Sequence, residues 1–329
     1  MAGLRHALKL FSNSSNVSYH CTRRLLNYSA MAYDGKADPA ETFFNDKVQS
    51  LLKSLTRVDY NKVFKRRKLG EKHLSDPVYK FMTEEELKEA LEVAKETAEE
   101  LLQIPPVVRV RDQNVKVLSR DPALQGLETS RLVFIDITYG TKDSDRLIVV
   151  REPDGTLQEA EWQLRQRMNQ TYFPQDKKYL ETPKMFEGEY FESLLDRHQY
   201  EYILDRACIQ FEPDDVEYQK AVTVTYQHVN DNNKFELLRS TRHFGSLTFF
   251  LVWNKIIDNL LLDLIETLHI HEAQDLIAVY SLVHKISFEG EQPLDQIKDF
   301  IKKSANKKAA LELAIQAYED TTVERAASF

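Results

Sequence analysis

Glycine and cysteine are both scarce in this chain of 329 residues, which contains 9 glycines and 2 cysteines. The two cysteines, Cys21 and Cys208, cannot form a Cys-rich zinc site or a disulfide framework. The shortage of glycine favours helices, because glycine weakens a helix interior by about 1 kcal/mol relative to alanine. Long apolar runs are also missing. The most apolar run, Phe244 to Trp253, has ten residues, whereas a membrane-spanning helix needs about 20.

Sequence motifs of enzymes are absent as well. The chain contains no GxGxxG, GxxxxGK[ST], GxSxG or HExxH. We therefore predict a protein that is not an enzyme, with no catalytic residue, cofactor or small-molecule substrate. We also predict no metal site, because His269 and His271 would point about 200° apart on a helix and could not share an ion with Glu272. His198 and His243 are isolated in the sequence and are expected to be surface or capping residues.

Acidic residues are missing from the first 33 positions, where every charged side chain is positive. On a helix, residues 2–13 place Leu4, Leu8 and Phe11 on one side and the basic residues on the other. An acid-free, serine-rich, basic amphipathic helix is typical of a mitochondrial transit peptide. We predict that residues 1–33 are such a peptide, cleaved between positions 24 and about 32, and that the protein works in the mitochondrial matrix. The alternative is an ordinary disordered tail. A secretory signal is excluded, because basic residues interrupt the apolar run.

The balance of charge is acidic, with 44 basic and 52 acidic residues and a net charge of −8. Removal of residues 1–33 takes away four basic residues and no acidic one, which leaves 40 against 52 and a net charge of −12. Such a charge argues against a surface that is coated with positive side chains for nucleic acid. We therefore expect protein contacts to dominate, with RNA touched at a few basic positions.

Hydrophobic periodicity divides the rest of the chain into three predicted parts. Residues 34–77 form an extended basic segment outside the core, with one short amphipathic helix that includes Phe43 to Leu55. Residues 78–175 form a small α+β domain, and residues 176–329 form an α-helical domain. The predicted fold class is α+β and predominantly helical. A small antiparallel β-sheet is flanked by helices and followed by a C-terminal stack of α-helical hairpins.

Local signals place the individual elements. Thr83 and Glu86 form a capping box that begins a helix over residues 83–102. Apolar residues alternate over 133–139 and return over 147–150, a turn follows at 152–155, and a short third strand comes next. Helices are predicted over 161–171, over 214–229 with Pro213 at the first position, and over 243–253, where apolar residues on all sides indicate burial. Pro293 is predicted to begin another helix.

Basic residues gather between Lys53 and Lys72, where eight stand against two acidic ones. The run at 65–68 admits three interpretations: binding to RNA phosphates, nuclear import, or pairing with the acidic helix that begins at Thr83. The predicted leader argues against the nucleus, and we favour RNA because consecutive charges in an extension reach a phosphate backbone easily. Arg239 and Arg242 precede the buried helix and either anchor a carboxylate, which we favour, or reach a phosphate. The candidate ribosomal-RNA contacts are Lys62, Lys65, Arg66, Arg67, Lys68, Arg239 and Arg242.

Longer stretches of the sequence resemble one known family. The stretch LIVVREPDGTLQEAEWQLRQRMNQTYFP from Leu147 to Pro174 is similar to the signature of the mitochondria-specific small-ribosomal-subunit proteins numbered twenty-two. So are QFEPD from Gln210 and LLRSTRHFG from Leu237, and FMTEEEL at 81–87 and LQIPP at 102–106 occur in the same order. The resemblance extends over roughly Phe43 to Tyr318 and rests on long ordered matches.

The resemblance implies a structural component of the small subunit of the animal mitochondrial ribosome, which supports mitochondrial translation. It implies contacts with neighbouring ribosomal proteins and with small-subunit ribosomal RNA, and no catalytic residue. The alternative is a matrix protein outside the ribosome, either a helical-repeat adaptor or an enzyme with a concave pocket of perturbed titratable groups.

Overall fold

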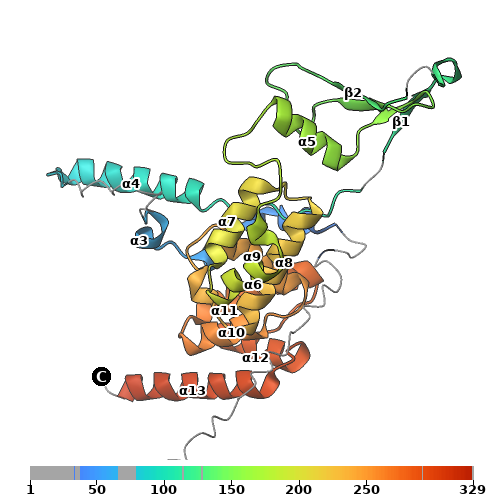
Figure 1. Cartoon of the computed structure of the whole chain (residues 1–329). Coiled ribbons are helices and arrows are strands. Elements are labelled where there is room, and N and C mark those ends of the chain that lie inside the picture. Colours follow the sequence, from blue (N-terminus) through green and yellow to red (C-terminus); the bar gives the residue numbers. More distant parts are fainter. Residues whose placement is uncertain are drawn as a thin grey trace, which may run out of the picture. The chain divides into compact units, whose positions relative to one another are not determined.

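The computed structural model describes Tyr33 and residues 38–65, 79–112, 115–126, 129–290 and 292–327. Within these ranges the chain is mostly helical, with one four-stranded antiparallel sheet (Figure 1). The predicted fold class, α+β and predominantly helical, is confirmed. The predicted transit peptide lies outside the described residues apart from Tyr33, and the predicted domain borders stay predictions.

The sheet contains β1 (Val117–Arg120), β2 (Leu132–Ile135), β3 (Ile148–Arg151) and β4 (Thr156–Glu159), in the order β1-β4-β3-β2. The strands predicted from alternation correspond to β2, β3 and β4. Strand β2 ends earlier than predicted, and Ile137 and Tyr139 beyond it are exposed. Strand β1 was not predicted, because all four of its residues are exposed and give no alternation of apolar and polar positions.

One face of the sheet carries a small core. Ile148 and Val150 of β3 are buried there, and Leu164 and Met168 of α5 (Trp162–Tyr172) pack against them. The predicted turn at 152–155 is present, with the Gly155 amide donating to the Glu152 carbonyl at 3.0 Å. Gly155 has φ +86°, a conformation that favours glycine, so the residue type fits the hairpin that joins β3 to β4.

The predicted short amphipathic helix is present as α1 (Pro39–Phe43) and α2 (Asp46–Thr56), followed by the short α3 (Tyr60–Val63). The expectation that this segment lies outside the core is wrong for α1 and α2, whereas α3 has no buried residue. Val48, Leu52 and Leu55 are at most 1% exposed, and α2 packs against α9 and α11. Phe43 meets Phe249 edge-on, with 5.1 Å between the ring centroids. The sequence thus predicted the amphipathic helix, but the high charge of the segment argued against the burial of its apolar face.

The helix predicted over 83–102 is α4 (Glu84–Leu101), and its capping box is present. The Glu86 amide bonds the Thr83 hydroxyl at 3.3 Å, and the Thr83 amide bonds the Glu86 carboxylate at 2.9 Å. Among the residues of α4 only Ala98 is buried. The sequence therefore predicted the helix correctly, but its apolar periodicity does not correspond to a buried face.

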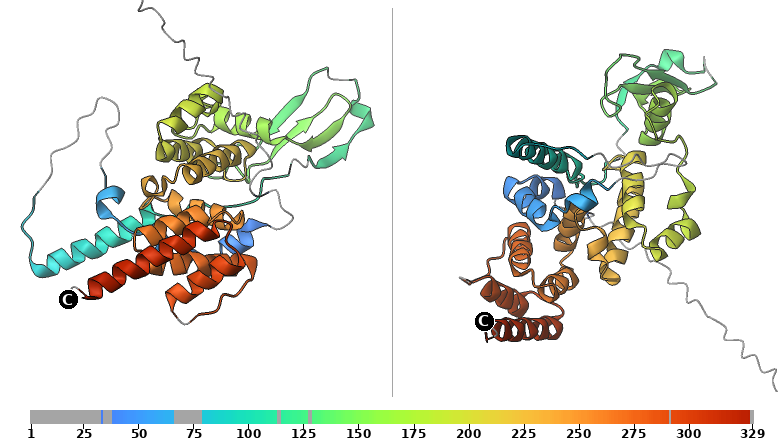
Figure 2. Two further views of the ribbon diagram at one scale, coloured as in Figure 1. Left: turned by 90° about the horizontal axis from the view of Figure 1, so that it is seen from below. Right: turned by 90° about the vertical axis from the view of Figure 1, so that its left-hand side faces the viewer.

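The remaining helices form the predicted stack of hairpins. Helix α7 packs on α8, α10 on α11 and α13, and α11 on α12. Figure 2 shows α13, in red, running beside α12 to the C-terminal mark. The bounds are α6 (Gly188–Asp196), α7 (Tyr200–Gln210), α8 (Val216–Asp231), α9 (His243–Trp253), α10 (Asp258–Glu266), α11 (Ile270–His284), α12 (Pro293–Lys303) and α13 (Lys308–Ala327), with short 3-10 turns η1 (Pro122–Leu124), η2 (Lys184–Phe186) and η3 (Phe235–Leu237).

Helix α9 lies in the main core, as its uniform apolarity predicted, and its residues 243–252 are all buried. The predicted start of α12 at Pro293 is also confirmed. The predicted start of α8 is wrong: the helix begins at Val216, and Pro213 precedes it. The reason is Asp215, which accepts a hydrogen bond from the Glu212 amide at 3.1 Å and holds residues 212–215 in a turn. In the described part of the chain, every helix is too short or too polar to span a membrane.

The close approach at Gly155 gives a test of the sheet. A Cβ atom on Gly155 would lie 2.1 Å from the Asp121 carbonyl oxygen, whereas one on Gly140, at φ +80°, would meet nothing within 4 Å. We expect Gly155→Ala to lower the free energy of unfolding by about 3 kcal/mol or more, and Gly140→Ala by only about 1 kcal/mol. Urea titration of the full chain measures both. Equal losses would contradict this account of the β3–β4 hairpin.

Candidate nucleic-acid interface

The basic segment after α2 is described only as far as Lys65. Lys62, on α3, points its ammonium group at Glu236 of η3, with Nζ 2.6 Å from Oε1 and 3.1 Å from the main-chain oxygen. Lys65 is exposed. Arg66, Arg67 and Lys68 lie outside the described residues. Of the predicted run at 65–68, the structure therefore places one exposed cation.

Arg239 lies at the centre of a buried ion-pair network rather than on the surface. Its side chain is 4% exposed. Its guanidinium contacts three carboxylates, with Nη2 3.0 Å from Asp263, Nη1 3.4 Å from Glu272, and Nε 3.2 Å from Glu236. Arg57, at the end of α2, pairs with Glu272 through both its Nε and its Nη2. Burial, followed by the charge of Arg57, lowers the pKa of Arg239, and the three carboxylates oppose this shift.

This arrangement decides between the two roles considered for Arg239. The structure shows the favoured one, in which the arginine anchors carboxylates inside the protein. The network joins α2, η3, α10 and α11, because its members come from all four elements. A guanidinium buried in this way is not available to a phosphate on the surface.

Arg242 occupies a separate position at the start of α9. Its Nη2 lies 3.2 Å from Asp205 of α7, and the same carboxylate accepts from His243 Nε2 at 2.9 Å. The Arg242 side chain is 35% exposed, whereas that of His243 is 1% exposed. His243 is thus a buried residue, and the expectation that it is a surface or capping residue is wrong. Burial lowers its pKa, and the hydrogen bond to Asp205 opposes this shift.

The sequence-predicted candidates are therefore only partly brought together. Lys62 and Arg239 share Glu236, whereas Arg242 pairs with Asp205 on a different helix. Each of these three cations is engaged by a carboxylate of the same chain. The positive charge that remains available in the described part of the candidate set is that of Lys65.

A polar cleft that the sequence analysis did not predict lies where two of the family-like stretches meet. It has a volume of about 690 Å³. Asp215 accepts two hydrogen bonds from Gln166 Nε2, at 2.9 and 2.7 Å, and pairs with Arg111. The Arg111 guanidinium also lies over the ring of Trp162, 4.5 Å from its centroid. Burial lowers the pKa of Arg111, and Asp214 opposes this shift.

The charges that line this cleft are largely used to hold the chain together. Asp215 precedes α8, Gln166 lies on α5, and Arg111 lies in the segment that leads into the sheet. Their contacts therefore join three segments that are distant in the sequence. Lys178, which also lines the cleft, makes another such contact: its ammonium group lies 3.1 Å from the Glu212 carboxylate.

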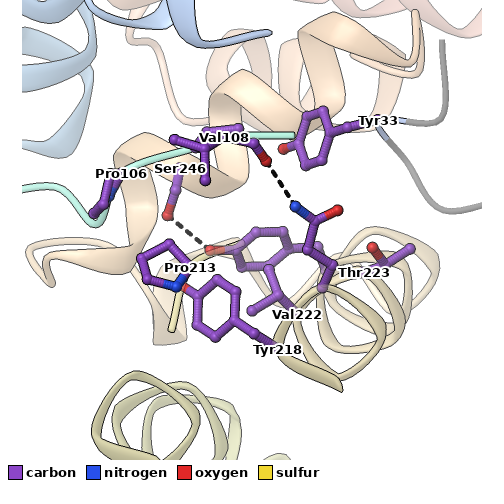
Figure 3. A pocket seen from close by; sticks show the side chains of 11 residues that line it. Tyr33, Pro106, Val108, Pro213, Tyr218, Val222, Thr223 and Ser246 are labelled. Carbon is purple, nitrogen blue, oxygen red and sulfur yellow. Dashed lines mark hydrogen bonds between the residues drawn. The ribbon is translucent and has the colours of Figure 1, made fainter. Parts of the chain in front are cut away.

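A second concavity, between residues 106–108 and helices α8 and α9, is much smaller (Figure 3). Its volume is about 20 Å³, which is room for about one water molecule. Two hydrogen bonds lie beside it, one between the Tyr226 and Ser246 hydroxyls at 2.7 Å and one from Gln219 Nε2 to the Val108 carbonyl at 2.6 Å (Figure 3). Burial raises the pKa of Tyr226. This pocket is too small for a substrate.

Two of the described histidines share one hydrogen-bond partner, the hydroxyl of Tyr200. Among the residues that the structure describes, no group of three or more His, Cys, Asp or Glu side chains is placed to hold an ion. His198 and His228 both bond the Tyr200 hydroxyl, at 2.8 and 2.9 Å. Burial, followed by the charge of Asp196, raises the pKa of Tyr200 to about 12. His198 is therefore part of a hydrogen-bonded chain that its sequence position did not reveal.

The fold and these contacts define the class of the protein. It is a predominantly helical α+β protein in which Arg57, Arg111 and Arg239 pair with carboxylates of the same chain. Comparison with known proteins supplies the family. Residues 41–285 match the model of the family described as "Mitochondrial 28S ribosomal protein S22". The chain belongs to this family.

Two related proteins support this family assignment. The chain is 37% identical over 294 residues to the small ribosomal subunit protein mS22 of Bos taurus, an alignment that covers 87% of this chain and 81% of the relative. It is 36% identical over 314 residues to the mouse (Mus musculus) protein of the same name, with 93% of this chain and 86% of the relative covered. The resemblance seen in the sequence is confirmed.

The Arg239 network predicts a large effect of removing its central cation. Arg239→Ala removes the cation that pairs with Asp263 and one of the two cations at Glu272, which keeps Arg57, so we expect the free energy of unfolding to fall by about 3–5 kcal/mol. Arg242→Ala, a matched control at a half-exposed pair, is expected to cost about 1 kcal/mol or less. Urea unfolding of the full chain measures both variants. A loss below about 1 kcal/mol for Arg239→Ala would contradict the role of the network.

Buried histidines predict that acid weakens the fold. Burial lowers the pKa values of His228, His243 and His284. The unfolded chain, with histidine pKa values near 6.5, therefore binds more protons than the folded chain. The stability from these groups is complete above about pH 6.5 and is lost as the pH falls through that value toward the lowered folded pKa values. Each histidine contributes at most about 1.4 kcal/mol per pH unit.

Urea unfolding at pH 7.5, 6.5 and 5.5 measures this loss. His284→Gln should flatten the dependence, whereas the exposed His271→Gln on the same helix α11 should leave it as in the unmodified chain. Identical slopes for the unmodified chain and His284→Gln would show that His284 is not linked to folding.

Proposed function

We propose that this chain is a structural component of the small subunit of the mitochondrial ribosome. It works in the mitochondrial matrix, supports mitochondrial translation, and contacts neighbouring ribosomal proteins and small-subunit ribosomal RNA. The observation that carries the proposal is the match to relatives named small ribosomal subunit protein mS22 over most of both chains. Residues 1–33 serve as its transit peptide in this proposal.

The role is structural and not catalytic. The residues around the large cleft, above all Asp215, Gln166 and Arg111, are bonded to one another. The small concavity at Tyr226 holds about one water molecule. The family membership disfavours a matrix enzyme or adaptor outside the ribosome.

The RNA contact is made by the basic run of Lys65, Arg66, Arg67 and Lys68. Two observations support this choice over the other candidates. Arg239 is buried among carboxylates, and Lys62 and Arg242 are paired with Glu236 and Asp205. Lys65, the described member of the run, is exposed and begins it.

Sedimentation of a mitochondrial lysate tests the proposed function. We expect the chain to migrate with the small subunit in a sucrose gradient, because a structural component stays bound during the run. Its recovery only in the soluble fraction at the top of the gradient would overturn the proposal.

Charge reversal tests the RNA contact separately. Lys65→Glu, Arg66→Glu, Arg67→Glu and Lys68→Glu together should lower ultraviolet crosslinking of the chain to ribosomal RNA by about tenfold or more, because each phosphate contact contributes to affinity. The matched control reverses four exposed lysines elsewhere, Lys116, Lys177, Lys234 and Lys255. Equal crosslinking of both variants would refute the assignment of the run.

A further inference from the structure

Helix α4 carries an apolar stripe whose leucines are exposed in the described chain. Leu87, Leu91, Ala94, Ala98 and Leu101 recur at three- and four-residue intervals and so lie along one side of the helix. The exposed fractions are 51% at Leu87, 61% at Leu91 and 51% at Leu101. Ala98 is buried, and α3 packs against α4 (Figures 1 and 2). Leu87 and Leu91, in the N-terminal half of the stripe, are thus both open to a partner.

The residues that lead into α4 extend the exposed apolar surface. Tyr79 is 90% exposed, Phe81 is fully exposed, and Met82, directly before the N-cap, is 48% exposed. Single exposed apolar residues are ordinary, but this many within one short segment mark an interaction surface. Spacing at i, i+4 and i+7 is the pattern by which a helix inserts its apolar side into a groove of another protein.

The charge of the same segment selects the partner. Residues 84–92 contain five glutamates, Glu84, Glu85, Glu86, Glu89 and Glu92, against one lysine, Lys88. An RNA backbone, an anionic membrane surface and a second copy of this helix would each bring negative charge against these carboxylates. A protein groove with basic side chains along its rim would instead be attracted.

We propose that the N-terminal half of α4 docks in an apolar groove with a basic rim on a neighbouring ribosomal protein. Leu87 and Leu91 enter the groove, and the glutamates meet its rim. This rests on the proposed function and deepens it by giving the chemistry of one protein partner. The chain's own run at 65–68 is a poorer occupant, because its four residues are all charged and none can cover the two leucines.

Photocrosslinking within assembled small subunits tests the proposal. A photoreactive amino acid replaces Leu91 in the full chain, and small subunits that contain it are isolated by sedimentation before irradiation. We expect one main adduct, with a ribosomal protein rich in lysine and arginine.

Addition of Glu85→Lys, Glu89→Lys and Glu92→Lys to the same chain should lower the yield of this adduct by about tenfold, because the basic rim then meets like charge. An adduct with RNA, with lipid, with residues 65–68 of the same chain or with an acidic protein overturns the proposal, as does no adduct.

A competition experiment provides a second readout. Leu87→Gln with Leu91→Gln, which should leave a helix of this exposure intact, is co-expressed with the unmodified chain, and the ratio of the two in small subunits is measured. We expect incorporation to fall by about tenfold. The matched control is Tyr172→Gln with Tyr190→Gln, at residues that are 61% and 63% exposed. No change, or an equal fall in both pairs, overturns the proposal.

The outcomes separate this inference from the proposed function. If the unmodified chain migrates with the small subunit and Leu91 gives no protein adduct, only the docking of α4 fails. If the unmodified chain stays at the top of the gradient, the ribosomal role itself fails.

Discussion

The ion-pair network around Arg239 is the interaction on which the arrangement of the helices depends most. It connects the end of α2, the turn η3, and helices α10 and α11 through Arg57, Arg239, Glu236, Asp263 and Glu272. Apolar packing alone is non-directional, whereas a planar guanidinium fixes the carboxylates that it bonds. The network and the packing of Val48, Leu52 and Leu55 together hold α2 on the helical stack.

The same network reduces the number of basic residues that are available to bind RNA. A count of arginines and lysines suggests several sites for phosphate, but the structure engages Arg57, Lys62, Arg239 and Arg242 with carboxylates of the same chain. Internal pairing offsets the charge of these cations, and burial also removes Arg239 from the surface. An acidic protein in a nucleoprotein assembly is consistent with the proposed function, in which the body binds proteins and one short basic run is proposed to contact RNA.

The features of the fold that could be predicted from the sequence are those with local signals. The capping box at Thr83, the uniform apolarity of α9 and the start at Pro293 each depend on a few neighbouring residues. Features that depend on distant partners could not be predicted. Arg239 meets its carboxylates 24 and 33 residues away, and Arg111 meets Asp215 across 104 residues. Strand β1 gave no signal, because none of its residues is buried.

The central claim is that contacts with proteins contribute more than contacts with RNA to holding this chain in the ribosome, and it is tested most directly by salt. The affinity of the chain for small subunits can be measured by sedimentation between 50 and 200 mM salt. If the basic run makes about four phosphate contacts, raising the salt over this range should weaken binding about a hundredfold or less. The reason is that each contact adds about 0.9 to the slope of the logarithm of affinity against the logarithm of salt concentration. A loss of about 10³-fold or more, as for six to ten phosphate contacts, would contradict the account.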